Sequence, residues 1–194
     1  MNPPVLFEER ATAGEACIAV ATLNVPATLN SLSLEMVDLL AAQLSAWATD
    51  ARVALVVLRG AGEKAFCAGG DLHALYKSMG EYRQSGATQA HKNAYAMAFF
   101  EREYRLDYQI HAYPKPILCW GHGIVMGGGI GLMSGASHRV VTQGSRLAMP
   151  ETGIGLFPDV GGTWLLSRAP GASGRFLALT GASIDASDAV YAGM

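Results

Sequence analysis

The sequence predicts an α/β protein with a mainly parallel sheet. Three apolar runs of strand length, at 16–23, 53–58 and 117–120, alternate with longer stretches whose apolar residues recur at helical spacing. The run at 53–58 has no polar alternation, which is typical of a parallel strand covered on both faces. Strands that alternate with helices along a chain favour layers of helices packed on one parallel sheet.

Caps and breaks place the helices between these strands. Ser33 is a candidate N-cap for a helix that ends near Trp47, and Asp71 is a candidate N-cap for a second helix. The polar stretch at 80–88 follows this second helix and is predicted to be a loop.

The longest helical pattern covers residues 92–112, and Pro114 lies where it must end. Three glycines at 127–129 follow the third strand, and a further helix is expected to begin there. The rest of the chain predicts a fourth strand at 138–142 and a short helix near Thr163.

Composition indicates one ordinary globular domain that spans residues 1–194. The chain is 51% hydrophobic and 15% charged, which provides enough apolar side chain for a core. Its net charge of −2 gives no general attraction to nucleic acid or to an anionic membrane, so neither is expected as a partner. No run reaches the about 18 apolar residues that a membrane span needs.

The three cysteines, Cys17, Cys67 and Cys119, are odd in number and widely spaced. This pattern predicts buried, reduced thiols in an intracellular protein. No close pair of Cys or His ligands occurs, so no metal site is expected. Residues 1–10 resemble neither a signal peptide nor an Arg-rich transit peptide, and we therefore expect a cytoplasmic location.

Two segments share a design in which a strand, a glycine-rich turn and a helix follow one another. The first turn ends at Gly69-Gly70, and the second is Gly127-Gly128-Gly129. Glycine allows a ligand to approach the backbone closely, and N–H groups at a helix start lack partners within the helix. Two such turns facing each other would direct two N–H donors at one developing oxyanion.

Other interpretations of the glycines compete with this one. They can be ordinary tight turns. The segment 60–65 fits the dinucleotide pattern G-x-G-x-x-A, but no helix opens directly after it and no acid follows at the required distance. A phosphate loop would need G-K-[ST], and the segment 131–135 is one residue out of the G-x-S-x-G of serine hydrolases.

Four spaced segments resemble the crotonase (enoyl-CoA hydratase/isomerase) superfamily. KAFCAGGD at 64–71 and GIVMGGG at 123–129 are similar to its two glycine-loop signatures. FFEREY at 99–104 and AMPETGIGLFPDVGG at 148–162 are similar to the 3-hydroxyisobutyryl-CoA hydrolase branch in particular. The resemblance runs from the first strand to the end of the chain and implies a crotonase-type spiral of ββα units.

The resemblance also implies roles for individual residues. The N–H groups of Gly70 and Gly128 would form an oxyanion hole, and the backbone at Ala68 would meet the adenine end of coenzyme A. Three acids fall on the positions that handle substrate and water in the hydrolase branch: Glu103, Glu151 and Asp159.

One departure within the superfamily supports the hydrolase branch. The hydratases that resemble this chain carry a second glutamate shortly after the triple glycine, where this chain has Gly131. Hydration of an enoyl thioester needs one group that activates water and another that delivers a proton. The hydrolase branch has a glycine at this position as well.

From sequence alone, each acid also has a structural interpretation. Asp159 can cap a short helix, and Glu151 can be a solvated loop carboxylate. Glu103 lies among Glu101, Arg102 and Arg105, which is more typical of an ion-paired surface residue.

Two basic side chains near the glycine turns are weaker candidates. His122 lies between two glycines and is more often a packed or hydrogen-bonded histidine than a base. Lys64 either reaches a phosphate of coenzyme A or is simply solvated.

The expected function is hydrolysis of a short branched 3-hydroxyacyl-CoA, as in valine breakdown, with no cofactor other than the coenzyme A of the substrate. An enoyl-CoA hydratase or isomerase that uses Glu151 alone is the first alternative, and a catalytically weak CoA-binding protein is the second. The resemblance implies a homo-oligomer. It also implies a helical C-terminal part beyond residue 194, so we expect the chain to be a fragment that exposes apolar residues near Phe176 and Val190.

Overall fold

The computed structural model describes residues 2–86, 88–89 and 92–194, and its larger sheet has five strands. Their order is β1-β2-β3-β5-β7, and their bounds are Val5–Ala11, Cys17–Leu23, Val53–Gly60, Ile117–Gly121 and His138–Val141. The β1 strand pairs antiparallel with β2, and the remaining pairs are parallel. The mainly parallel sheet expected from the apolar runs is confirmed.

A smaller parallel sheet has three strands in the order β4-β6-β8: Ala65–Cys67, Ile124–Met126 and Arg146–Ala148. Both β1 and β2 belong to the larger sheet, and from β3 on the strands alternate between the larger sheet and the smaller one. The units β3-β4 and β5-β6 are each followed by a helix, which gives the repeating ββα pattern. The glycine turns lie where each small-sheet strand passes into its helix.

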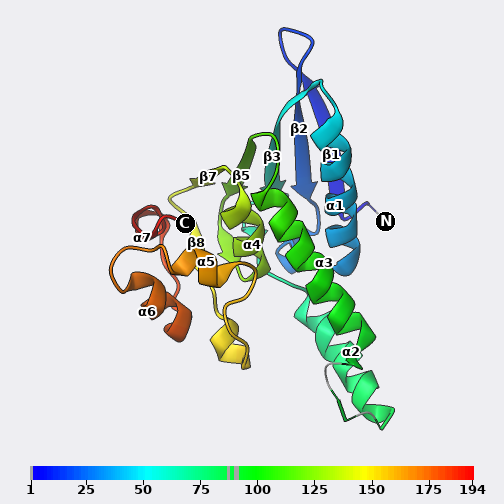
Figure 1. Ribbon diagram of the computed structural model, residues 1–194, viewed down its shortest axis with the longest axis vertical. Helices are drawn as coiled ribbons and strands as arrows, with labels where there is room; N and C mark the ends of the chain where they lie inside the picture. The colour runs from blue at the N-terminus through cyan, green and yellow to red at the C-terminus, as the bar shows by residue number, and fades with distance from the viewer. Residues whose placement is uncertain (1, 87, 90–91) are drawn as a thin grey trace.

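Seven α-helices complete the described part of the chain: α1 Leu34–Thr49, α2 Leu72–Gln84, α3 Ala94–His111, α4 Gly128–Gly135, α5 Gly162–Leu166, α6 Ser173–Thr180 and α7 Ala186–Ala192. Short 3-10 turns occur at η1 (Pro26–Thr28) and η3 (Glu151–Ile154). Figure 1 shows α1 beside the large sheet, while α5, α6 and α7 gather on the opposite side of the molecule. The long α3 runs between these two parts, and α2 projects from the body (Figure 1).

Side-chain caps begin the helices that were expected. Ser33 accepts a hydrogen bond from the Met36 N–H at 3.2 Å, and Asp71 accepts one from the Ala74 N–H at 3.1 Å. The loop predicted at 80–88 was wrong for its first half, because α2 continues to Gln84. Residue 87 lies outside the described residues.

The short strands of the smaller sheet, and β1, were not predicted. Three-residue strands such as β4 give too little sequence for a period-two pattern, and glycines border β6 on both sides. The β1 strand carries Glu8, Glu9 and Arg10, and this edge position leaves them exposed or half-buried.

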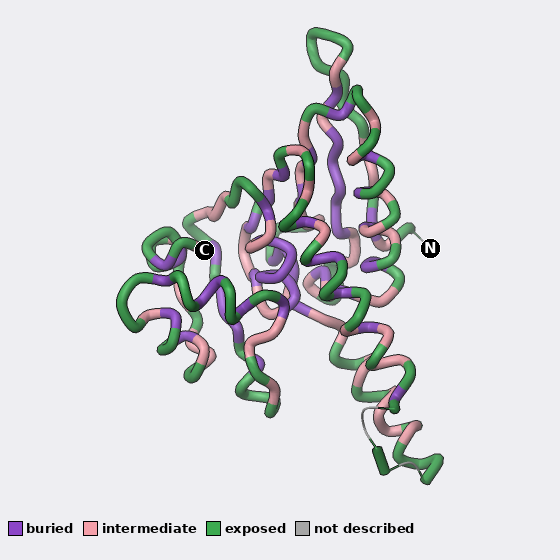
Figure 2. Tube along the Cα trace, viewed as in Figure 1, coloured by how far each residue is buried: buried purple, intermediate pink, exposed green. Residues whose placement is uncertain are grey.

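Two elements beside the glycine turns, β4 and α4, are largely buried. Figure 2 shows β2 and α4 buried along almost their whole length, whereas the far end of α2 is exposed. Phe66 and Cys67 of β4 are completely buried, with 0% of their surface exposed. The turn that follows β4 is therefore anchored in the core.

Asn30 fixes the approach to the first glycine turn. Its side chain is completely buried, accepts a hydrogen bond from the Val25 N–H at 3.0 Å, and donates to the carbonyls of Ala61 at 3.0 Å and Ala65 at 2.9 Å. Its φ of 55° is left-handed, a conformation that asparagine tolerates better than most residues. One amide group thus ties the segment before α1 to both ends of the β3–β4 connection.

We expect Asn30→Ala to lower the free energy of unfolding by roughly 2–4 kcal/mol, because one buried and two part-buried backbone groups lose their partner. Asn24→Ala is the matched control, since its side chain makes one exposed hydrogen bond to the Pro3 carbonyl. Urea denaturation of both variants measures the difference. Equal losses in the two variants would contradict the role given to Asn30.

Candidate active site

All six residues predicted for the site line one cavity of about 310 Å³. They come from four separate places in the chain: the β4–α2 turn (Ala68 and Gly70), α3 (Glu103), the start of α4 (Gly128), and the segment from η3 to α5 (Glu151 and Asp159). Apolar side chains form much of the remaining wall: Leu72, Leu75, Phe99, Phe100, Ile154 and Leu156. The cavity is a mostly apolar space with acids and glycine backbone on its surface.

The two glycine turns lie directly against each other. A Cβ atom added to Gly69 would lie 3.5 Å from the amide nitrogen of Gly128, and one added to Gly127 would lie 3.8 Å from the Cα of Gly69. Both residues have positive φ, at 102° for Gly69 and 51° for Gly127, which favours glycine. A Cβ at Gly69 would also lie 3.1 Å from the Met126 carbonyl oxygen, which is a tight contact.

Within the described part of the chain, the N–H groups of Gly70 and Gly128 donate no hydrogen bond. The isolated bridge between Leu32 and Gly70 uses the Gly69 carbonyl and the Asp71 N–H, each at 2.8 Å, and not the Gly70 N–H. Gly128 is the first residue of α4, where the N–H has no partner in its own helix. Both glycines line the same cavity.

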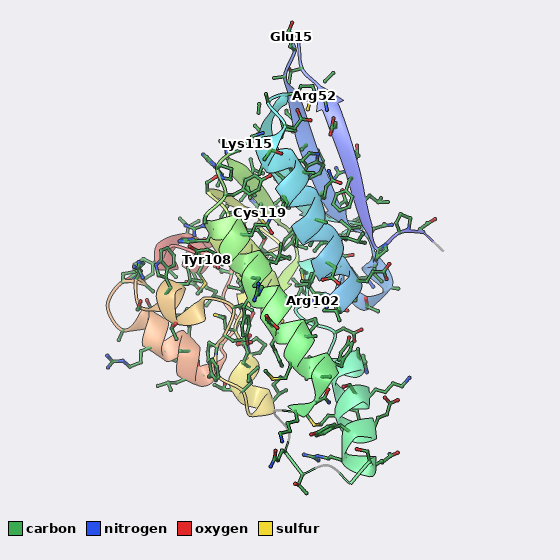
Figure 3. The ribbon with its side chains drawn as sticks, turned by 45° about the vertical axis from the view of Figure 1, so that its right-hand side comes forward. Glu15, Arg52, Arg102, Tyr108, Lys115 and Cys119 are labelled. Carbon is green, nitrogen blue, oxygen red and sulfur yellow. The ribbon has the colours of Figure 1, made fainter. Side chains whose placement is uncertain are left out.

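Glu103 lies inside the cavity wall and is not the ion-paired surface residue that its neighbours suggested. Only 2% of it is exposed, and burial, with Asp159 and Glu151 adding to it, raises the pKa of its carboxyl to about 8. The ion pairs of this helix are made instead by Arg102 with Asp38 of α1 and by Arg105 with Glu101. Figure 3 shows Arg102 on the side of α3 toward α1.

Glu151 and Asp159 face the same space from the loop after β8. Glu151 is buried, its Oε2 atom has no hydrogen-bond partner among the described residues, and burial raises the pKa of its carboxyl. Its Oε1 atom would be 3.1 Å from a Cβ at Gly127, so it lies beside the glycine turns. Asp159 accepts a hydrogen bond from the Tyr104 hydroxyl at 2.6 Å, and the N-cap of the following helix is Gly161.

Two further residues near the cavity, Asp107 and Val160, were missed from the sequence. Asp107, one turn after Glu103 on α3, is 8% exposed and has no hydrogen-bond partner on either oxygen among the described residues. Burial, followed by Glu103 and Asp159, raises the pKa of its carboxyl well above the usual range. The sequence did contain a signal for the burial of Glu103 and Asp107. Both acids fall within the apolar stripe that Phe99, Leu106 and Ile110 form on the same helix.

Asp107 and Val160 occupy the room in front of Gly131. A Cβ added to Gly131 would lie 2.7 Å from the Val160 Cβ and 2.8 Å from Asp107 Oδ1. The missing glutamate noted in the sequence therefore has a structural counterpart: there is no space for any side chain at this position.

The remaining candidate residues from the sequence do not line this cavity. His122 shares a 2.9 Å hydrogen bond with the Gly62 carbonyl, as a packed histidine would, and Lys64 is exposed. All three cysteines are free and buried, and burial raises the pKa of Cys67 to about 12.

The described residues contain no group of three acids, histidines or cysteines arranged to hold a metal. Among them, no helix combines the length and apolar character that crossing a bilayer requires.

Comparison with known proteins gives consistent relatives. The profile of the enoyl-CoA hydratase/isomerase family matches residues 18–194. A mitochondrial 3-hydroxyisobutyryl-CoA hydrolase of Danio rerio is 44% identical over 190 residues, which cover 98% of this chain and 46% of the relative. The chain thus spans about half the length of the curated relatives it matches.

Two solved structures share the fold closely. An enoyl-CoA hydratase from Rhodobacter sphaeroides superimposes with a TM-score of 0.87 at 42% identity, over 98% of this chain and 52% of that one. A carnitinyl-CoA dehydratase from Mycobacterium thermoresistibile gives 0.88 at 45% identity, over 99% and 52%.

The cytoplasmic location expected from the sequence was wrong. The hydrolase relatives from several vertebrates are all named as mitochondrial. Reduced, buried cysteines indicate a reducing compartment, but they do not show which reducing compartment of the cell it is.

The raised pKa of Glu103 predicts that stability decreases as pH rises. Between the ordinary value of 4.5 and about 8, the folded protein keeps a proton that the unfolded chain releases. We expect the free energy of unfolding to fall through this window by up to about 1.4 kcal/mol per pH unit for this group. Glu103→Gln should remove that contribution, because glutamine does not ionise.

Urea titrations between about pH 5 and pH 8 measure this slope. Glu101→Gln is the matched control, because Glu101 lies on the same helix but is exposed and paired with Arg105 at 2.8 Å. The control should keep the wild-type slope. If Glu103→Gln also keeps it, the carboxyl of Glu103 does not carry the raised pKa.

Proposed function

Because the chain belongs to the enoyl-CoA hydratase/isomerase family, we propose that it binds an acyl-CoA thioester between its two glycine turns and hydrolyses it to a free acid and coenzyme A. The observation that carries the proposal is that Gly70, Gly128 and three acids line one mostly apolar cavity. The hydrolase names of the relatives that are 44% identical support the same reaction.

In this proposal the thioester carbonyl oxygen accepts hydrogen bonds from Gly70 and Gly128. Glu151 takes a proton from a water molecule, the water oxygen attacks the carbonyl carbon, and negative charge develops on the oxygen that faces the two N–H groups. Collapse of this intermediate breaks the carbon–sulfur bond, and Glu151 returns the proton to the departing thiolate. Direct attack by Glu151, followed by hydrolysis of the resulting anhydride, gives the same products.

The other acids are proposed to position the reactants. The raised pKa of Glu103 keeps its carboxyl protonated at neutral pH, so it can both donate to and accept from a substrate hydroxyl. Asp159, held by the Tyr104 hydroxyl at 2.6 Å, would orient the water. A short branched 3-hydroxyacyl group fits these roles and the small apolar cavity, and it corresponds to the substrate named for the relatives.

The alternative function is hydration of an enoyl-CoA. It is favoured by the names of the two solved structures, a hydratase and a dehydratase. One assay separates the functions: with a panel of acyl-CoA thioesters, free thiol marks hydrolysis, and loss of enoyl absorbance without free thiol marks hydration. Binding with neither product would leave a catalytically weak CoA-binding protein.

Glu151→Gln should reduce kcat for thiol release by roughly 10²–10⁴-fold, because a positioned general base is lost. Binding of the thioester should persist, since the amide keeps the shape of the side chain. Stopped-flow thiol detection and calorimetry measure the two properties. Glu35→Gln is the control, because Glu35 is exposed in the first turn of α1; wild-type kcat in Glu151→Gln would remove the proposed base.

Gly128→Val should reduce kcat by roughly 10²–10³-fold, the usual cost of one lost oxyanion donor. A side chain at this position meets Glu103 Oε1 and comes within 3.2 Å of the Leu32 side chain, so the start of α4 must shift. The same change in a Glu103→Ala background separates the effects. If the double variant is no slower than Glu103→Ala, Gly128 acts only through Glu103 and the oxyanion hole is wrong.

A further inference from the structure

A second cavity, of about 350 Å³, lies behind the proposed acyl site. Its walls come from α3, α4 and α5, and they are mostly aromatic or glycine: Tyr104, Tyr108, Trp164, Gly131, Gly135 and Gly161. Figure 3 shows Tyr108 on the side of α3 that faces the C-terminal helices, where this cavity lies. The mechanism proposed above does not use this space.

Val160 is the side chain that lines both cavities. It is buried, with 4% exposed, and it packs so closely on Gly131 that a Cβ there would be 2.7 Å from its own. Beside it, the Tyr104–Asp159 hydrogen bond joins a residue of the second cavity to one of the first. Val160 therefore forms the partition between the two spaces.

The backbone at Val160 is strained for the residue it carries. Its φ is 44°, a left-handed value that a β-branched residue adopts at a cost. Gly161, the next residue, also has positive φ and is a glycine, as this conformation favours. Because glycine would adopt this backbone conformation at a lower cost, the valine indicates a role for its side chain.

The far cavity has a polar end. Asp107 lines it, is more than nine-tenths buried, and has both oxygens without a partner among the described residues. A carboxyl in this state has capacity for hydrogen bonds that no protein group fills. The space therefore suits an apolar chain with a hydroxyl near its end.

We propose that Val160 determines acyl-chain specificity by ending the acyl cavity, so that short acyl groups are accepted and longer ones are excluded from the space that Asp107 lines. This inference rests on the proposed function, since it assumes that the acyl group lies in the first cavity. Removal of the Val160 side chain would join the two cavities and admit a longer chain.

The test uses S-alkyl-CoA thioethers, which cannot be hydrolysed, so binding is measured apart from reaction. Calorimetry should show that the wild type binds S-butyl-CoA and binds S-octyl-CoA at least roughly tenfold more weakly, since the added methylenes find no pocket. Val160→Gly should bind S-octyl-CoA at least roughly tenfold more tightly than the wild type does. A terminal hydroxyl on the octyl chain should improve binding to Val160→Gly further, and Asp107→Leu in that background should abolish this improvement.

Two controls keep the result interpretable. Trp164→Ala enlarges the far cavity without opening the partition, because Trp164 lines the far cavity and not the acyl cavity, so the wild-type preference should remain. Circular dichroism checks folding of Val160→Gly, in which the left-handed backbone favours the new residue.

A folded Val160→Gly with the wild-type chain-length profile would overturn the inference, and so would a wild type that binds both thioethers equally. A wild type that binds thioethers but releases no thiol from any thioester would overturn the proposed hydrolysis alone. Absence of thioether binding in the wild type would overturn both.

Discussion

The first turn of α4 packs directly on the backbone at the end of β4, and the geometry of the site follows from this contact. A Cβ at Gly129 would come within 3.0 Å of the Cys67 Cβ and closer still to the Cys67 carbonyl, so the helix can approach only as glycine. The contact brings Gly127 and Gly128 against Gly69. Because β4 and β6 are neighbours in the small sheet, both turns leave the same edge, and Gly70 and Gly128 line one cavity.

The acids around this cavity come from elements that differ in rigidity. Glu103 and Asp107 are one turn apart on the long helix α3, so their separation is fixed by the helix. Glu151 and Asp159 belong to a loop that is held by the small sheet at one end and by α5 at the other. Burial and mutual repulsion raise the pKa values of Glu103, Asp107 and Glu151, which disfavours their charged forms. Burial of these acids therefore lowers the stability of the fold, because water would solvate them better.

Much of the fold could be predicted from the sequence, because the long elements carry strong periodic signals. The strands predicted at 16–23 and 53–58 from continuous apolar runs correspond to β2 and β3, and Ser33 caps α1 as its residue type predicted. The strands of the small sheet were not predicted, since three residues between turns cannot show a period. Their existence depends on pairing with segments far away in the chain, as Ala65 does with Ile124.

The site was predicted in part for a similar reason. Four segments matched family signatures, and their residues do line one cavity. The burial of Glu103 was hidden by the charges of its sequence neighbours, although Phe99 and Leu106 place it on the apolar face of the helix. Asp107 lies outside these segments, and Val160 lies within one of them without a role of its own. The partition between the two cavities is defined by the packing of Val160 on Gly131. These two residues come from different parts of the chain, so the sequence does not show that they meet.

The buried cysteines have a consequence for chemical durability. A protein that cleaves thioesters would release a free thiol into its own cavity at every turnover, next to the turn that follows Cys67. Thiol–disulfide exchange and oxidation both proceed through the thiolate. The Cys67 sulfur has no exposed surface and a pKa near 12, and Cys17 and Cys119 are also buried. Burial and the raised pKa of Cys67 therefore disfavour a mixed disulfide between this cysteine, beside the glycine turn, and the coenzyme A released in the cavity.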